Sequence, residues 1–365
     1  MKNLEYKKFI IRTFLFLIPF FIMSAVELAL PVNYFSHRFW ESINVYNRAG
    51  RILLPGPFYP NMKMSMVETG DLGVHTPNEV IKNVEWVTNN DGYRTRLSPN
   101  EQYDIVLVGD SLAVGSGLDQ KETAAEVLSK SIGKDVYGMG GILMTEFLHS
   151  DYLTVHSPKT IVLVQMERDL TDVSNFSTKY TYNFISFSHE IAQKIIHTFH
   201  LEKLTDVFVL LDRFLKQNMY HYFRANTQYF FEAKPVIKFD NSPMLFFQGD
   251  IANKEVSKQD FNLTVSKIVE VDKVLKEKGI QLIFVPVPNK ETIYWDSLPS
   301  KTKPHFIPDL VKALNEKGVK AVNTQDQFFK ATIKENKTLY HTDDTHWNAE
   351  GVKETMKLVS PLIKK

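Results

Sequence analysis

The chain opens with a helix-length apolar segment that follows a basic start. Four basic residues, the last of them Arg12, precede an uncharged run over residues 13–26 that is rich in Phe, Leu and Ile. Counted from 9 to 32, the segment is long enough to cross a bilayer, which takes about 20 residues. The basic side is expected in the cytoplasm. We therefore predict a single-pass membrane anchor over residues 1–32, with a cleaved signal peptide and a buried core helix as alternatives.

Beyond the anchor, short apolar runs alternate with amphipathic stretches. The runs typical of buried strands are residues 103–109, 135–137, 160–165, 281–287 and 319–322. The stretches that favour helices are residues 122–131, 144–156, 261–275 and 307–317, and a last one that begins near 349. Repeated strand–helix units predict an α/β fold with a doubly wound, mostly parallel sheet.

Two stretches break this alternation. Residues 33–102 contain several prolines and a turn at 89–92, and we expect an irregular lead-in there. Residues 171–255 are aromatic-rich and helix-like, so we expect a helical insert within a catalytic domain that covers 103–365. The aromatic side chains of this insert can form the core of a small subdomain, a substrate platform, a membrane-facing surface or a partner interface.

Composition narrows the function classes. Lys and Arg number 43 against 42 for Asp and Glu, so no overall charge drives the chain onto nucleic acid. The chain has no cysteine, which excludes disulfides, a thiol nucleophile and Cys-ligated zinc or iron–sulfur sites. The chemistry must therefore come from other side chains, and we expect no cofactor.

The first candidate for chemistry is Ser111, which directly follows the first strand in the triplet Gly109-Asp110-Ser111. Catalytic groups in open α/β sheets gather at the carboxyl ends of strands. A serine at this point, followed by Gly115 and Gly117, can expose both its hydroxyl and its backbone N–H. The alternative is a turn or helix cap, where Asp and Ser are common.

The second candidate is the segment Asp343-Asp344-Thr345-His346-Trp347 near the C-terminus. A carboxylate shortly before a His can hold its Nδ1–H and leave Nε2 free as a base. The alternatives are a polar loop with a capping Asp and a metal site built from Asp343, Asp344, His346 and His341. We expect no metal, because the sequence offers no second ligand cluster.

Together these two segments carry a resemblance. A Gly-Asp-Ser after the first buried strand and an Asp-x-His in the last loop resemble the SGNH (GDSL-type) hydrolases. The Glu167-Arg168-x-Leu element, Pro288-Asn-Lys-Glu-Thr-Ile-Tyr294 and Asp344-Thr-His-Trp347 resemble the SGNH-like domains of the alginate O-acetyltransferase type. The resemblance covers roughly residues 100–360 and rests on the motifs rather than on their order along the chain.

The resemblance implies a catalytic triad of Ser111, His346 and Asp344. It implies an oxyanion site at Gly140, and it places Arg168 where the hydrolases usually carry an Asn, so Arg168 is a candidate oxyanion or substrate residue. Further candidates around the triad are the carboxylates Asp110 and Asp343 and the side chains of Lys290, Tyr294 and Trp347. Lys290 and Tyr294 can line the cleft or lie on the surface, and Trp347 can pack in the core or stack on a sugar.

The implied function is extracytoplasmic O-acylation, with acetyl as the expected group, of a cell-surface or secreted polysaccharide. The resemblance implies a partner, a membrane-bound O-acyltransferase of the MBOAT class that delivers the acyl group, and no nucleic acid. An SGNH carbohydrate esterase and a non-catalytic partner of a membrane acyltransferase are the alternatives.

Overall fold

The computed structural model describes residues 2–45, 50–74, 76–179, 184–231, 236–238, 244–250 and 255–363. The chain divides into two compact units. A helical unit combines residues 1–55 with 184–234, and a sheet unit combines 56–183 with 235–365. Parts of the expected insert, residues 180–183, 232–235, 239–243 and 251–254, lie outside the described residues.

The sheet unit is built on a parallel sheet with the strand order β4-β3-β5-β8-β9. Its strands are β3 (Ile105–Gly109), β4 (Tyr137–Gly140), β5 (Thr160–Met166), β8 (Gln281–Val287) and β9 (Lys320–Ala321). Strands β3 and β5 are buried along their whole length, as their unbroken apolar runs predict. The chain places β4 on one side of β3 and β5 on the other, so a switch point lies at the carboxyl end of β3.

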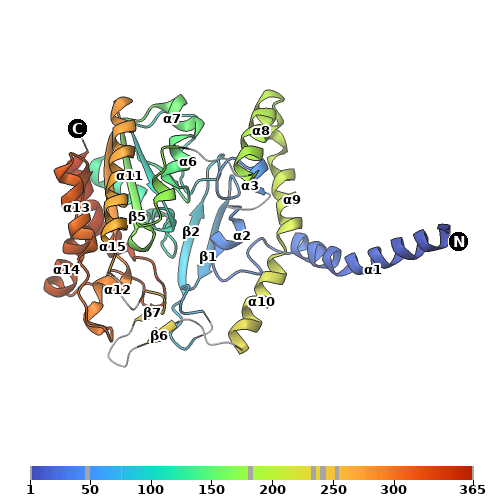
Figure 1. Ribbon diagram of the computed structural model, residues 1–365. Coiled ribbons are helices and arrows are strands. Elements are labelled where there is room, and N and C mark those ends of the chain that lie inside the picture. The colour runs from blue at the N-terminus through green and yellow to red at the C-terminus, as the bar shows by residue number, and fades with distance from the viewer. Residues whose placement is uncertain are drawn as a thin grey trace. The chain divides into compact units, whose positions relative to one another are not determined.

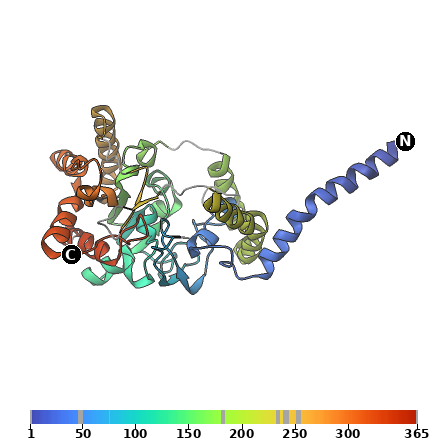
Figure 2. The same ribbon diagram turned by 90° about the horizontal axis from the view of Figure 1, so that it is seen from below.

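Helices cover both faces of this sheet. Alternate strand residues divide between two cores, with Val106, Ile161 and Phe284 in one and Leu107, Val162 and Ile283 in the other. The first core includes α6 (Met144–Leu148), α7 (Asp151–His156), α11 (Lys258–Glu277) and α13 (Phe306–Glu316). The second includes α4 (Ser111–Val114), α5 (Ala124–Ile132), α14 (Thr324–Glu335) and α15 (Ala349–Val359). Figure 2 shows α11 and the red C-terminal helix α15 on opposite sides of the sheet. The doubly wound, mostly parallel prediction is confirmed.

The structure differs from the sequence expectation in four places. Residues 33–102 are not wholly irregular, because β1 (Lys63–Glu68) and β2 (Lys82–Val87) form an antiparallel pair. The single helix expected over 144–156 is two helices, because α6 ends before His149 and the extended backbone at Ser150, the N-cap of α7, separates them. Helix α14 has no counterpart in the expectation. The insert also carries a second short pair, β6 (Val236–Lys238) with β7 (Leu245–Phe247).

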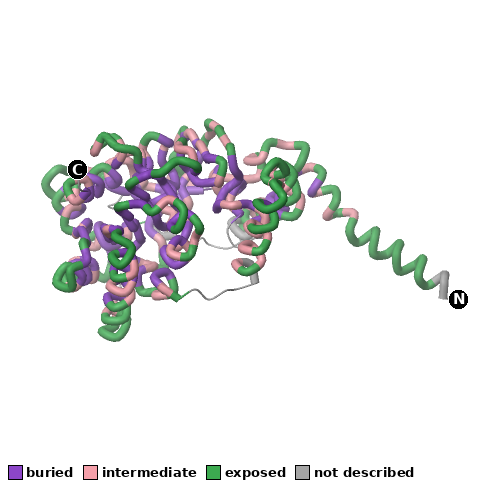
Figure 3. The backbone as a smooth tube through the Cα atoms, turned by 90° about the horizontal axis from the view of Figure 1, so that it is seen from above, coloured by how far each residue is buried: buried purple, intermediate pink, exposed green. Residues whose placement is uncertain are grey.

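The helical unit contains α1 (Lys2–Ala29), α2 (Phe39–Ile43), α3 (Gly50–Leu53), α8 (Phe184–Thr198), α9 (Thr205–Lys216) and α10 (Asn218–Phe231) (Figure 1). Within α1, residues 5–29 are long and apolar enough to cross a membrane. Only 6% of the most apolar window in this helix is buried, and Figure 3 shows most of the helix exposed. The apolar N-terminal helix is therefore a candidate membrane anchor or signal segment.

Candidate functional site

The candidate nucleophile lies in a tight turn at the end of β3. Asp110 caps α4, since its Oδ1 accepts a hydrogen bond from Leu112 N at 2.8 Å, and Ser111 is the first residue of that helix. The second oxygen, Oδ2, accepts from Met166 N at 2.7 Å and so ties the turn to the end of β5. Burial raises the pKa of Asp110 to about 6. Asp110 is thus a positioning residue beside Ser111.

Close packing of glycines lets this turn form. A Cβ on Gly109 would meet Val164 O at 2.0 Å, and one on Gly140 would meet Val114 N at 2.5 Å. Gly140 is the last residue of β4 and pairs with Gly109 in the sheet register. The first turn of α4 can therefore approach β4 only because residue 140 has no side chain. The structure places Gly140 next to α4, the helix that begins at Ser111.

His346 meets Ser111 from a loop far along the chain. His346 Nε2 lies 2.8 Å from Ser111 Oγ, and Nδ1 lies 2.5 Å from Asp344 Oδ1. The same Asp344 oxygen accepts from the backbone N of His346 at 3.0 Å, which fixes the loop and the ring together. Asp344 is fully buried and His346 is 6% exposed. The three residues expected as a triad thus form one chain of hydrogen bonds.

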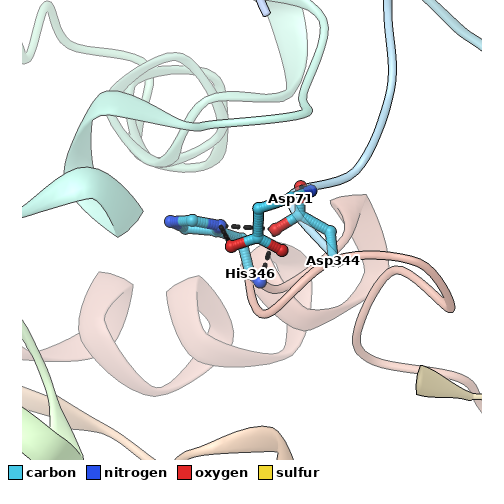
Figure 4. Close-up of side chains that lie close together, drawn as sticks. All are labelled: Asp71, Asp344 and His346. Carbon is cyan, nitrogen blue, oxygen red and sulfur yellow. Dashed lines mark hydrogen bonds and ion pairs between the residues drawn. The ribbon is translucent and has the colours of Figure 1, made fainter. Parts of the chain in front are cut away.

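A second carboxylate, Asp71, joins the site and was missed from the sequence. It accepts from the backbone N and hydroxyl of Thr345 at 2.8 and 2.6 Å, and its Oδ2 lies 3.9 Å from His346 Nδ1. Its own backbone N donates to Asp344 Oδ2 at 3.1 Å. Figure 4 shows both carboxylates on the Nδ1 side of the His346 ring. Asp71 lies in the stretch expected to be irregular.

Asp343 anchors the loop from the other side and does not orient His346. Its Oδ2 accepts from the backbone N of Gly70 and of Val80, both at 2.9 Å, and its Oδ1 lies 2.8 Å from Lys82 Nζ. A Cβ on Gly70 would meet Asp343 O at 2.0 Å. The glycines that flank Asp71, at 70 and 73, were the sequence signal of this close approach. The two neighbouring carboxylates therefore have different roles: Asp344 holds the ring and Asp343 holds the segment 70–82.

Lys290 holds the loop that carries Asp344 and His346 from inside the protein, and it lines neither a cleft nor the surface. The residue is fully buried, and its Nζ donates to the carbonyl oxygens of His341, Thr342 and Asp344 at 2.7, 3.0 and 3.1 Å. Burial lowers its pKa to about 8. Glu167 holds the segment that carries Lys290, since its Oε2 accepts from Asn289 N at 2.8 Å. The Glu167-Arg168-x-Leu element and the segment 288–294 thus both support the loop that carries His346, called the base loop below.

The remaining candidates, Arg168, Trp347 and Tyr294, make no described hydrogen bond or ion pair with Ser111. Arg168 Nη1 forms an ion pair with Asp250 Oδ2 at 3.0 Å, and none of the interactions described for Arg168 joins it to Ser111. Trp347 is fully buried in the core, so it offers no face to a sugar. The Tyr294 hydroxyl accepts from Leu339 N at 3.3 Å, and burial raises its pKa to about 12.

Asp71, Asp344 and His346 also form the kind of cluster that can hold a metal ion. Asp71, Asp344 and His346 offer donor atoms within 4.8 Å of one another. Each of these atoms already has a hydrogen-bonding role: His346 Nδ1 on Asp344, and Asp71 on Thr345. The arrangement fits an oriented imidazole base better than a ligand set.

Comparison with known proteins supports the family resemblance. Residues 244–365 match the family model described as SGNH hydrolase-like domain, acetyltransferase AlgX. The match includes Asp344 and His346 but begins after Ser111, so it is shorter than the stretch of 100–360 that the motifs suggested. No curated protein matches the chain.

Solved structures give weaker likenesses. A lipolytic protein of the G-D-S-L family from Veillonella parvula DSM 2008 matches with a TM-score of 0.36 and 11% identity, over 71% of this chain and 97% of that one. An acetyl xylan esterase from Butyrivibrio proteoclasticus gives a TM-score of 0.31 and 10% identity, over 78% and 65%. Both are too weak to support an argument about function. Residues 244–365 are thus similar to the SGNH hydrolase-like domain of the acetyltransferase AlgX family.

Proposed function

We propose that this chain is an extracytoplasmic O-acyltransferase that moves an acyl group, most simply acetyl, onto a hydroxyl of a cell-surface or secreted polysaccharide. The observation that carries the proposal is the hydrogen-bonded series Ser111–His346–Asp344. The match to an acetyltransferase family model supports acyl transfer as the reaction class. An assembled triad argues against a purely non-catalytic role.

The first half-reaction loads the serine. Ser111 Oγ attacks the carbonyl carbon of the acyl donor while its proton passes to His346 Nε2. Asp344 accepts the Nδ1–H and stabilises the imidazolium that forms. The donor's leaving group then departs with the proton from Nε2. The product is an acyl ester on Ser111 with a neutral His346.

The second half-reaction transfers the acyl group from Ser111 to the acceptor. A sugar hydroxyl gives its proton to His346 Nε2 and attacks the acyl carbon, and the proton then returns to Ser111 Oγ as the serine leaves. Every bond formed on the sugar replaces one broken on the serine. Water in place of the sugar gives hydrolysis, so a carbohydrate esterase is the competing outcome of the same site. The balance depends on how the site binds the acceptor and excludes water.

The oxyanion has one backbone donor in the turn itself. Ser111 opens α4, and the first N–H groups of a helix have no acceptor within it. We assign the second donor to the neighbourhood of Gly140, which packs on the same turn. A lost oxyanion donor typically lowers the rate by about 10²–10³. Arg168 is left out of this role because its guanidinium is paired with Asp250.

The proposal places α1 in the membrane with the sheet unit outside. The basic residues before the apolar run favour a cytoplasmic N-terminus. An acyl donor made inside the cell then needs a route across the bilayer, and a multi-spanning acyltransferase of the MBOAT class supplies it. The polysaccharide acceptor is met on the outer side.

The test uses the full chain in detergent micelles with 4-nitrophenyl acetate and a series of polysaccharide fragments. Released nitrophenol, free acetate and acetylated oligosaccharide are measured for wild type and for Ser111→Ala, with Ser129→Ala on α5 as the matched control. The proposal predicts serine-dependent turnover in which one class of glycan replaces water as the acceptor, so that acetylated oligosaccharide forms at the expense of free acetate. Serine-dependent release of acetate that no glycan diverts would favour the esterase, and equal rates for wild type and Ser111→Ala would overturn both.

A further inference from the structure

Helix α9 exposes its apolar side. Four side chains of the helix and that of its N-cap residue, Leu204, follow at helical spacing, and each is between 42% and 54% exposed. These residues are Leu204, Val207, Leu210, Leu211 and Leu215. A helix on a water-soluble protein normally turns such a face toward the core.

The opposite side of α9 is polar and buried. Asp212, Lys216 and Gln217 are 3%, 6% and 9% exposed. Lys216 Nζ donates to the carbonyl oxygen of Glu41 at 2.7 Å, so its charge is satisfied inside the helical unit. The arrangement is the reverse of a water-facing helix. It is the arrangement expected when the surroundings of the unit are themselves apolar.

Helix α8 repeats the pattern. Phe187, Ile191, Ile195 and Phe199 follow one another at intervals of four residues and are 54%, 44%, 47% and 68% exposed. Residues four apart lie on the same face of a helix. The apolar stripes of α8 and α9 together, nine residues in all, are called the α8–α9 stripe below.

The candidate membrane helix is packed directly on α9. Ser24 Oγ of α1 donates to Phe214 O at 3.0 Å, and the rings of Phe20 and Phe214 meet edge to face at 5.3 Å. Arg213 Nη2 donates to the carbonyl oxygens of Glu27 and Leu30 at 2.6 and 2.8 Å. The C-terminal turn of α9 is therefore fixed to the last third of α1, so the helix that, with its N-cap, carries five of the stripe residues packs directly on the candidate membrane helix.

The direction of α9 fits a helix that lies flat on a membrane. Figures 1 and 2 show α1 leaving the helical unit across the axis of α9 rather than along it. If α1 crosses the bilayer, α9 then runs along the membrane surface at the depth where α1 emerges. An amphipathic helix with one polar and one apolar face is stable in that position, with its apolar face among the acyl chains.

We propose that the α8–α9 stripe is seated in the membrane–water interface, where lipid covers it. The helical unit is then held by α1 across the bilayer and by α8 and α9 along its surface. This inference goes beyond acyl transfer and requires only that α1 stays in the membrane. Lipid is the occupant we favour because α9, which carries part of the stripe, packs directly on the candidate membrane helix α1.

The absence of cysteine makes the test direct. Leu211→Cys and Val207→Cys, each labelled with an environment-sensitive nitrobenzoxadiazole group, place single probes on the stripe of the full chain. Asp206→Cys, on an exposed polar position of the same helix, is the matched control. The proteins are reconstituted in vesicles of phosphatidylethanolamine and phosphatidylglycerol. Quenching by lipids with a nitroxide on the acyl chain is compared with quenching by iodide in the water.

We expect lipid quenching of the Leu211 and Val207 probes to exceed that of the Asp206 probe several-fold, with iodide quenching in the reverse order. Two stripe positions guard against a local effect of one label. Strong iodide quenching at all three positions would overturn the inference, because the stripe would then face water. Protection of the stripe from both quenchers would overturn it as well, because protein rather than lipid would cover it. Neither quenching measurement depends on catalytic activity, so this test can fail or succeed independently of the proposed function.

Discussion

The two halves of the candidate site are held in different ways. The turn with Ser111 is set by its neighbours in sequence and by adjacent strands, through the Asp110 cap and the close packing of Gly109 and Gly140. The loop with His346 is held by residues from remote parts of the chain. Asp71, for example, reaches Thr345 across a separation of 274 positions.

This difference teaches where the site is sensitive. The serine turn is fixed at the carboxyl end of β3 by the neighbouring strands, so it should tolerate removal of the serine oxygen without loss of structure. The base loop has little regular structure of its own and depends on the half-buried charges of Asp71 and Lys82 and the buried charge of Lys290. Changes there should affect stability and catalysis together, unless the changed group acts on the ring alone.

The largest effect is expected at the turn. Ser111→Ala removes the nucleophile, and loss of a serine nucleophile has cost another serine enzyme about 10⁶ in kcat. We predict a comparable loss of acyl transfer with an unchanged thermal unfolding midpoint, because Ser111 Oγ contacts His346 and leaves the Asp110 cap intact. Activity with 4-nitrophenyl acetate and a melting curve measure the two quantities. A clear drop in the midpoint would show that the turn is less self-contained than the contacts indicate.

The next effect is expected at the orienting carboxylate. Asp344→Asn keeps the shape of the side chain but favours the wrong tautomer of His346, and such a change costs about 10⁴ in kcat in a serine protease. We predict a loss of that order. A matched Asp71→Asn variant should lose far less, because Asp71 lies 3.9 Å from Nδ1 against 2.5 Å for Asp344. A larger loss at Asp71 would exchange the roles of the two carboxylates.

A smaller effect on rate, with a larger one on stability, is expected at Asp343. Asp343→Asn leaves Lys82 Nζ, on a side chain only 11% exposed, without its 2.8 Å ion-pair partner. Loss of one partner of a buried pair typically costs about 3–5 kcal/mol. We predict a loss of about 3 kcal/mol in unfolding free energy and a kcat within about tenfold of wild type. The double variant with Lys82→Met should recover part of the stability, and failure to do so would show that the backbone contacts of Asp343 matter more than its charge.

The smallest effect concerns pH. Burial raises the pKa of Glu167 to about 7 from an ordinary value of 4.5, so the folded chain binds a proton more tightly than the unfolded chain. The stability this contributes is present below about pH 4.5 and is lost as pH rises through 7. We predict that Glu167→Gln, whose amide oxygen can accept the same bonds, flattens the fall in stability between pH 5 and 8 by roughly 2–3 kcal/mol. Parallel slopes for variant and wild type in denaturant titrations would contradict this.

The same difference explains what the sequence could predict. Ser111, Asp344 and His346 were accessible because each lies in a short motif next to a strand end or a cap. The roles of Asp343 and Lys290 were not accessible, because contacts across more than fifty positions leave no periodic pattern. For Asp71 the sequence signal was limited to the flanking glycines at 70 and 73, which do not name a partner. Strand β1 was missed because its residues alternate between exposed and half-buried, and its one buried residue is the charged Glu68.

The helical unit adds a second lesson of this kind. The 3.6-residue period of α9 is visible in the sequence, but the period alone does not tell which medium the apolar face meets. Arg168 shows a related limit, since its place in the motif suggested the oxyanion and its partner Asp250 comes from the insert. In each case the pattern gave the element and the tertiary contacts gave the role.

The most direct test of the central claim is mass spectrometry of the acyl-enzyme. The full chain is mixed with 4-nitrophenyl acetate, quenched in acid and digested, and acetyl is quantified on the peptide that contains Ser111, with and without a glycan that accepts acetyl in the transfer assay. Our account predicts one acetyl group on Ser111 that disappears as acetylated glycan accumulates, and none at this position in Ser111→Ala. Transfer that proceeds at the wild-type rate while Ser111 stays unmodified at every time point would contradict it.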